Sequence, residues 1–142
     1  MSHSRLIKRK LSVRPLFHQV DMMGVLHNVQ YFLWFEEGRL QIAEEILPVT
    51  EAVRLHVAMP VTKNICDYHR PVRYGDVLVL YTTHCLLPAY EGRLAFDHSL
   101  VNTATKIEVA NGTTVTTLVD MKTGQLVKEW PADLWRRYQE LQ

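Results

Sequence analysis

The sequence is poor in cysteine and has no long apolar run. Its two cysteines, Cys66 and Cys85, fall in strands that we predict to be neighbours and show no metal-ligand spacing, which indicates reduced thiols in a cytosolic protein. The seven histidines form no HxH or HxxxH pair, so we expect no metal site. No stretch approaches the roughly 18 apolar residues of a membrane span, and the first residues lack the apolar core of a signal peptide. We therefore expect a soluble, cytoplasmic protein with no cofactor and no membrane partner.

The sequence also lacks an excess of either charge. Sixteen lysines and arginines face fifteen aspartates and glutamates, which leaves a formal net charge of +1. We therefore expect no nucleic-acid partner, because nothing in the bulk charge would attract one. The 142 residues, 47% of them hydrophobic, suffice for one core, and there are no repeats, linkers or low-complexity segments. We predict a single domain that spans residues 1–142.

The chain is organised around the stretch from Val20 to Ile46, which predicts a loop followed by the only long helix. Asn28 is a good N-cap residue, and no proline interrupts the run before Pro48. Apolar residues recur at helical spacing, so one face of this helix is expected to be buried along about five turns. These residues are Phe32, Phe35, Ile42, Ala43 and Ile46.

A lone carboxylate, Asp21, precedes this helix, and Gly24 lies between the two. The first amide N–H groups of a helix have no internal partner and carry the positive end of its dipole, so they could hold a developing oxyanion. If the turn at Gly24 folds Asp21 towards the helix start, a carbonyl group between them meets a carboxylate on one side and amide donors on the other. These are two of the parts needed for acyl transfer.

Most of the remaining chain is predicted to be β-strand. Pro15 cannot donate to a ladder, which places a first strand, Leu6 to Gln19, at a sheet edge. After Val61 the sequence is rich in β-branched and aromatic residues with regular breaks, which predicts an antiparallel meander. Its strands are expected at Val61 to Tyr74, Asp76 to Leu87, Arg93 to Thr103 and Lys106 to Met121, with a bulge or further turn at Asn111–Gly112 and short helices at Glu51 to His56 and Trp130 to Gln142.

This order of elements sets the fold class. One strand, one long apolar helix and a run of antiparallel strands predict an α+β domain in which the sheet covers the helix. A curved sheet with a free edge leaves apolar surface for a second subunit, so we also expect a homodimer or a homotetramer.

Two motifs carry a resemblance to a known family. The first runs from Asp21 to Arg39, and the second, YHRPVRYGDVL, runs from Tyr68 to Leu78. Together they resemble the hotdog-fold acyl-CoA thioesterases of the 4-hydroxybenzoyl-CoA thioesterase type, and the resemblance covers roughly residues 9 to 120 in the right order. The matching positions of the first motif are Asp21, Gly24, His27, Asn28, Tyr31, Trp34, Phe35, Glu36 and Arg39.

The resemblance implies a hotdog fold, in which an antiparallel sheet wraps around one long central helix, with the active site at a dimer interface. It implies hydrolysis of an acyl-CoA, or of an acyl carrier protein thioester, to a carboxylic acid and a thiol. Asp21 would be the catalytic carboxylate, either as nucleophile through a mixed anhydride or as general base for water. Gly24 would let the backbone approach the thioester, and the backbone N–H of Asn28 would polarise the thioester carbonyl.

The other candidate residues each keep a structural alternative. His27 is a candidate catalytic residue, but some relatives carry a histidine at the next position, and a partly buried structural histidine is an equal alternative. Tyr31 is either a substrate contact or a packing residue. Arg93 is either a partner of the CoA phosphates or an ordinary surface charge. Glu36 and Arg39 are explained by an intrahelical ion pair.

Two other functions stay open. A hotdog acyl-CoA hydratase or dehydratase needs a His/Asp or His/Glu acid–base pair, which His18 or His27 with Glu36 could imitate. A non-catalytic acyl-CoA binding module is expected to have lost the loop carboxylate, which this chain retains as Asp21. The presence of Asp21 therefore favours the thioesterase.

Overall fold

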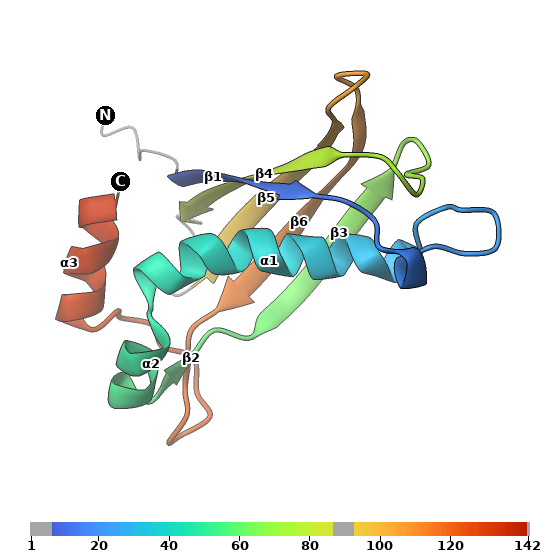
Figure 1. Ribbon diagram of the computed structural model, residues 1–142. Coiled ribbons are helices and arrows are strands. Elements are labelled where there is room, and N and C mark those ends of the chain that lie inside the picture. Colours follow the sequence, from blue (N-terminus) through green and yellow to red (C-terminus); the bar gives the residue numbers. More distant parts are fainter. Residues whose placement is uncertain (1–6, 87–92, 142) are drawn as a thin grey trace.

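The computed structural model describes residues 7–86 and 93–141, which form a five-stranded antiparallel sheet with a long helix, α1, across one face (Figure 1). The strand order is β1-β4-β5-β6-β3, and β2 and β7 form a separate two-stranded sheet. This combination confirms the predicted α+β class. The strands are β1 (Ile7–Val13), β2 (Val57–Ala58), β3 (Val61–Tyr68), β4 (Leu78–Leu86), β5 (Arg93–Asn102), β6 (Glu108–Thr117) and β7 (Val119–Asp120), and the helices are α1 (Asn28–Ile46), α2 (Val49–Leu55) and α3 (Ala132–Leu141), with a 3-10 turn, η1, at Phe17–Gln19.

The helix α1 buries one face against the sheet, as the spacing of its apolar residues predicts. Phe35 and Ile46 are almost completely buried. Gly38 permits a close approach, because a Cβ atom at this position would collide with the side chains of Thr82 and Leu80 on β4. The missing side chain therefore lets the middle of α1 lie directly on the sheet.

The strand order corrects the predicted meander. The strands β4, β5 and β6 do follow one another, but β3 pairs with β6, at the edge of the sheet opposite β1. Two strands therefore separate Cys66 on β3 from Cys85 on β4, so the prediction that they lie on neighbouring strands is wrong. The edge position of the first strand is confirmed.

The connection between β3 and β4 explains this order. The strand expected to continue to Tyr74 ends at Tyr68, because the chain then leaves the sheet and runs past the loop that precedes α1. There the N–H of Tyr74 donates to the carbonyl of Gly24 at 3.0 Å. Residues 69–77 thus cross from one edge of the sheet towards the other, which the tight turn expected at residues 75–76 could not do.

The last long strand differs from the prediction in its interior. Asn111 and Gly112 pair regularly with β3 and β5, so the expected bulge or turn at these residues is wrong. An irregularity lies instead between Leu100 and Val101 on β5. Gly112 serves packing, because a Cβ atom there would collide with the ring of Phe35 on α1.

Several element boundaries also shift. The first strand, expected to continue to Gln19, ends at Val13, and Phe17 belongs to η1 and is 81% exposed. The helical turn expected after Pro48 is α2, and the segment predicted as one strand up to Met121 divides into β6 and β7. The terminal helix begins at Ala132, within the predicted segment. The predicted end residues Leu6, Leu87 and Gln142 lie outside the described residues.

Two groups of buried apolar side chains fill the space between α1 and the sheet. One lies under the N-terminal half of α1 and includes Phe35; the other lies under its C-terminal half, includes Ile42 and receives Tyr138 from α3. A buried histidine accompanies each group: His98 stacks on Phe35 with ring centroids 4.3 Å apart, and His84 meets Tyr138 edge to face. Each half of this apolar core therefore contains a buried histidine.

Candidate functional site

The loop before α1 is held together by the carboxylate at its start. The Oδ1 atom of Asp21 accepts hydrogen bonds from the N–H groups of Met23 at 2.8 Å and Val25 at 3.1 Å. Gly24 has a φ of 73°, in the left-handed region that favours glycine, which permits the turn. The Asp21 side chain is exposed, and its Oδ2 atom accepts no hydrogen bond from the described residues. One carboxylate oxygen therefore fixes the loop, and the other remains available.

The start of α1 corrects one prediction. His27, not Asn28, is the N-cap: its backbone is extended, with φ −62° and ψ 140°, while its carbonyl accepts the N–H of Gln30 at 3.0 Å. Asn28 is the first helical residue, and the cap makes no side-chain hydrogen bond. Within the described part of the chain, the N–H groups of Asn28 and Val29 have no hydrogen-bond partner. The helix therefore opens with two unpaired main-chain donors.

The exposure of the two residues at the helix start decides one of the alternatives. The side chains of His27 and Asn28 are both exposed. His27 is therefore not the partly buried structural histidine that the sequence left open. Its main chain has a structural role, because its N–H donates to the carbonyl of Gln19 at 3.0 Å and ties η1 to α1.

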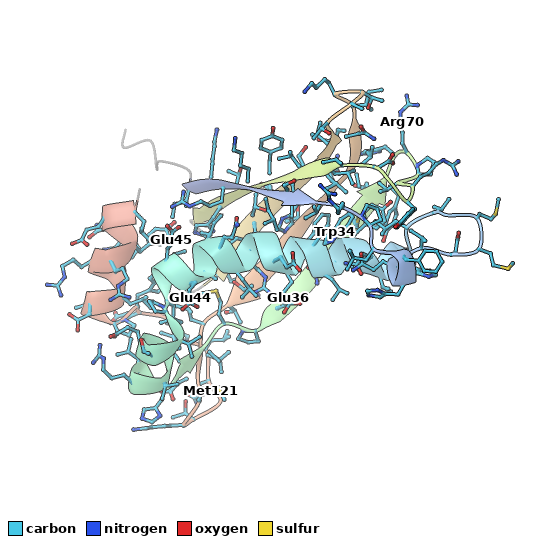
Figure 2. All side chains as sticks on the ribbon, in the orientation of Figure 1. Trp34, Glu36, Glu44, Glu45, Arg70 and Met121 are labelled. Atoms are coloured by element: carbon cyan, nitrogen blue, oxygen red, sulfur yellow. The ribbon has the colours of Figure 1, made fainter. Side chains whose placement is uncertain are left out.

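A depression of about 290 Å³ adjoins the helix start. Tyr31 lies at its base, 3% exposed, with its ring centroid 4.8 Å from that of Tyr68, whose hydroxyl donates to the carbonyl of Asn28 at 3.1 Å. Burial raises the pKa of Tyr31 to about 12, so its phenol is neutral at physiological pH. Tyr31 therefore packs against Tyr68 and also lines the depression, so both of its alternatives stay open. The depression is lined by Val25, Leu26, Asn28, Tyr31, Tyr68, His69, Arg70 and Pro71, and Figure 2 shows Arg70 on the connection that follows β3.

The structure does not bring Arg93 to this site within one chain. Arg93 begins β5, and the other end of that strand, Asn102, pairs with Leu78. Leu78 in turn pairs with Val13, at the end of β1 that leads to the Asp21 loop. At about 3.4 Å per residue, β5 separates its two ends by roughly 30 Å. Four of the six candidate residues thus share the loop and helix start, Tyr31 lies one turn further on, and Arg93 lies at the far end of the sheet.

The sequence did not predict that a charged residue, Arg39, lies buried under the middle of α1. Arg39 is 9% exposed and makes no hydrogen bond or ion pair with the described residues, so the expected pair with Glu36 is not formed. Burial lowers the pKa of Arg39, and the charge of Glu36 opposes this shift. A signal was present in the sequence, because Arg39 follows Phe35 by four residues and precedes Ile42 by three, on the buried face.

A chain of hydrogen bonds leads from the core towards this arginine. The Oγ1 atom of Thr114 donates to Oδ1 of Asn64 at 2.8 Å, so it accepts the Nε2–H of His98 at 3.0 Å. The Nδ1 atom of His98 then accepts the hydroxyl of Thr82 at 3.1 Å. Burial, with a smaller effect of the charge of Arg39, lowers the pKa of His98 to about 4, which keeps the ring neutral at pH 7. In this chain of hydrogen bonds each donor therefore points from Thr82 through His98 and Thr114 towards Asn64, and we call the chain the relay.

Two further depressions border Arg39. One, of about 190 Å³, lies between the middle of α1 and β3 and is described below. The other is an apolar cavity of about 400 Å³ between the C-terminal half of α1, α2 and β2. Glu44 and Met121 belong to its lining, and Figure 2 shows the first on α1 and the second beyond β2. The chain thus offers an apolar volume of ligand size, away from the Asp21 loop.

The described residues contain neither a grouped set of metal ligands nor a membrane-spanning helix. In residues 7–86 and 93–141, no three His, Cys, Asp or Glu side chains are grouped so as to hold a metal ion. In the same residues, no helix combines the length and the apolar character needed to cross a membrane.

Comparison with known proteins gives matches over most of the chain. The family model of the thioesterase-like superfamily matches residues 15–137. YneP of Bacillus subtilis, provisionally named an acyl-CoA thioesterase, is 23% identical over 104 residues, which are 72% of this chain and 72% of that protein. Among solved structures, the 1,4-dihydroxy-2-naphthoyl-CoA thioesterase from Synechocystis matches with a TM-score of 0.79 at 16% identity, covering 93% of this chain and 95% of that one. A Staphylococcus aureus protein in complex with CoA matches with a TM-score of 0.78 at 15% identity, covering 97% and 86%.

These matches settle the fold and the family. The solved structures share the arrangement of one long helix on a curved antiparallel sheet, which confirms the hotdog fold that the resemblance implied. The matched residues 15–137 include the Asp21 loop, all of α1 and every strand from β2 to β7. The chain belongs to the thioesterase-like superfamily.

Proposed function

We propose that this chain hydrolyses acyl thioesters of CoA or of an acyl carrier protein to a carboxylic acid and a thiol. One observation carries the proposal: an exposed carboxylate with an uncommitted oxygen, Asp21, lies in the short loop that runs into a helix with two unpaired N–H groups. Membership of the superfamily, the name of YneP and the CoA bound to the Staphylococcus aureus protein support this choice of substrate.

The roles of the loop residues follow from these groups. The N–H of Asn28 holds the oxyanion that forms when the thioester carbonyl carbon is attacked. Asp21 either attacks that carbon itself, expelling the thiolate and forming a mixed anhydride that water then opens, or takes a proton from the attacking water. Gly24 leaves room for the thioester beside the backbone, and His27 supplies an exposed polar side chain at the helix start.

A second subunit is part of the proposal. The edge strand β3 exposes Val61 and Ile65, and α1 exposes Leu33 and Leu40, which together form an apolar surface beside an unpaired strand edge. A second copy of the chain would cover this surface. Arg93 can reach a CoA at the Asp21 loop only from such a partner, because the length of β5 separates the two within one chain. Light scattering at micromolar concentration should give the mass of two or four chains, and the mass of one chain would contradict the proposal.

The substitution Asp21→Asn tests the chemistry. Asparagine retains the Oδ1 acceptor for the N–H groups of Met23 and Val25 but is neither a nucleophile nor a base. Thiol release from the best acyl-CoA substrate should fall by at least about a hundredfold, while the melting temperature stays near that of the wild type.

A matched control is available at another turn. Asp120 also uses its Oδ1 atom to accept two main-chain N–H groups, those of Lys122 at 2.8 Å and Thr123 at 3.3 Å, so Asp120→Asn makes the same chemical change away from the proposed site. This control should hydrolyse the substrate at nearly the wild-type rate. If Asp21→Asn also retains activity within a few-fold of wild type, the carboxylate is structural and the proposed mechanism is wrong.

A further inference from the structure

The depression of about 190 Å³ between α1 and β3 combines apolar walls with four polar residues. Arg39 is one of its two buried polar members: the residue is 9% exposed, yet its guanidinium has no hydrogen-bond or ion-pair partner among the described residues. Burying a cation without a partner is costly, so its donors must meet either solvent or a ligand in the depression. The walls are formed by Phe32, Leu33 and Val61, and the polar lining by Glu36, Arg39, Asn64 and Thr114.

Asn64 presents a second set of donors to the same depression. Its Oδ1 atom is occupied by the hydroxyl of Thr114, which is held in turn by the neutral ring of His98. The relay therefore fixes the direction of the amide, and the Nδ2–H groups of Asn64 make no hydrogen bond with the described residues. A buried relay that ends in a free amide at the surface fixes the position of a donor for a ligand oxygen.

Glu36 decides what kind of oxygen the depression accepts. Its exposed carboxylate lies close enough to Arg39 to favour the charged guanidinium, although the two form no ion pair. Arg39 and Glu36 together carry no net charge, so the depression offers donors on one side and an acceptor on the other. A hydroxyl group both accepts and donates and so fits both groups, whereas a carboxylate, although attracted by Arg39, would be repelled by Glu36.

The depression lies along the same helix face as the proposed oxyanion donor. Phe32, Glu36 and Arg39 follow Asn28 by four, eight and eleven residues, which keeps them on one face. At about 1.5 Å per residue they lie roughly 6 to 16 Å along the axis, and helical side chains lean back towards the N-terminus. An acyl chain with its carbonyl at the N–H of Asn28 would therefore extend along α1 towards Arg39.

We propose that this depression binds a hydroxyl group carried on the acyl chain far from the thioester carbon, with Arg39 and Asn64 as donors to its oxygen and Glu36 as acceptor of its proton. The apolar wall of Phe32, Leu33 and Val61 contacts the carbon chain that leads to it, and a second copy of the chain seated beside Leu33 and Val61 would enclose that carbon chain. This specificity rests on the proposed thioester hydrolysis, and it makes distally hydroxylated acyl groups the preferred substrate class.

The test compares three substrates with eight acyl carbons: octanoyl-CoA, ω-hydroxyoctanoyl-CoA and ω-carboxyheptanoyl-CoA. For the wild type, kcat/KM should be at least about tenfold higher for the hydroxylated ester than for octanoyl-CoA, because a site that hydrogen-bonds a hydroxyl discriminates against its absence. Arg39→Met and Asn64→Leu should each remove most of this preference, measured as the ratio of kcat/KM for the two esters within each variant. Arg54→Met, a change at an exposed arginine bonded to Glu51, should preserve the preference.

Three outcomes would overturn the proposal: equal rates for the hydroxylated and plain esters in the wild type, a preference that survives both Arg39→Met and Asn64→Leu, or a preference for the carboxylated ester. Asn64 is an exposed strand residue, so Asn64→Leu keeps the test valid if Arg39→Met does not fold.

Calorimetric binding to the Asp21→Asn variant separates this proposal from the proposed catalysis. That variant should bind ω-hydroxyoctanoyl-CoA about tenfold more tightly than octanoyl-CoA, whether or not Asp21 is catalytic. Equal affinities would overturn the hydroxyl site and leave the thioesterase proposal standing.

Discussion

Two positions on the β4–β5 ladder, two residues apart, each bury a histidine, and the two histidines are used differently. At one position His84 on β4 faces Phe96 on β5. Its Nδ1–H donates to the carbonyl of Ala95 at 2.9 Å, and its Nε2 atom accepts the hydroxyl of Tyr138 at 3.0 Å. Both ring nitrogens are therefore bonded to buried groups, and the second bond ties α3 to the sheet.

At the other position the histidine lies on the opposite strand. His98 on β5 faces Thr82 on β4, and its bonds continue through Thr114 to Asn64 at the surface. One histidine thus bonds to two buried groups and ties α3 to the sheet, while the other transmits its orientation to a depression beside α1. The comparison indicates that the α3 end of the core is organised for stability, and that the middle of α1 is organised to present polar groups.

The comparison first predicts a strong loss of stability in mild acid. Burial lowers the pKa of both His84 and His98 to about 4, whereas an unfolded histidine titrates near 6.5. The unfolded chain therefore takes up protons that the folded chain refuses, so the stabilisation is complete above about pH 6.5 and is lost as the pH falls towards 4. The loss approaches about 3 kcal/mol per histidine at the lower end of this range.

Urea unfolding followed by circular dichroism, at steps between about pH 7 and about pH 5, measures this effect, because the histidines begin to titrate above the usual range of carboxylates. The free energy of unfolding should fall steadily across that interval. A constant value would mean that the two rings accept protons in the folded state.

The sequence predicts some parts of this architecture because they depend on local pattern. The extent of α1, the loop around Asp21 and the existence of strands after Val61 all follow from periodicity and turn residues. The order of the strands does not, because it depends on residues 69–77 bonding to the loop before α1, a contact between distant segments. A local reading of Gly75 as a tight turn therefore placed β3 beside β4.

The residues of the candidate sites likewise divide into those whose proximity the sequence predicts and those whose proximity depends on the order of the strands. Asp21, Gly24, His27 and Asn28 adjoin one another in sequence, so their proximity could be predicted. The depression near Arg39 could not, because it requires knowing that β3 lies beside the middle of α1 and that β6 carries Thr114 to Asn64. The position of Arg39 on the apolar face of the helix was the sign of this depression in the sequence. Its spacing from Glu36 suggested an intrahelical ion pair instead.

A smaller loss of stability is expected when each histidine is replaced separately. His84→Leu removes the partners of two buried groups and should lower the free energy of unfolding by about 1–3 kcal/mol, with a weaker dependence on pH. It should leave the preference for a hydroxylated acyl chain unchanged, because its hydrogen bonds are to Ala95 and Tyr138, neither of which lines the depression. His98→Leu should cost a similar amount but also weaken that preference several-fold, because the amide of Asn64 is then no longer held in one direction. The two variants are compared by urea unfolding and by kcat/KM for octanoyl-CoA and ω-hydroxyoctanoyl-CoA. If the two variants alter the preference equally, the relay through His98 has no special connection with the depression, and the contrast between the two histidines is one of position alone.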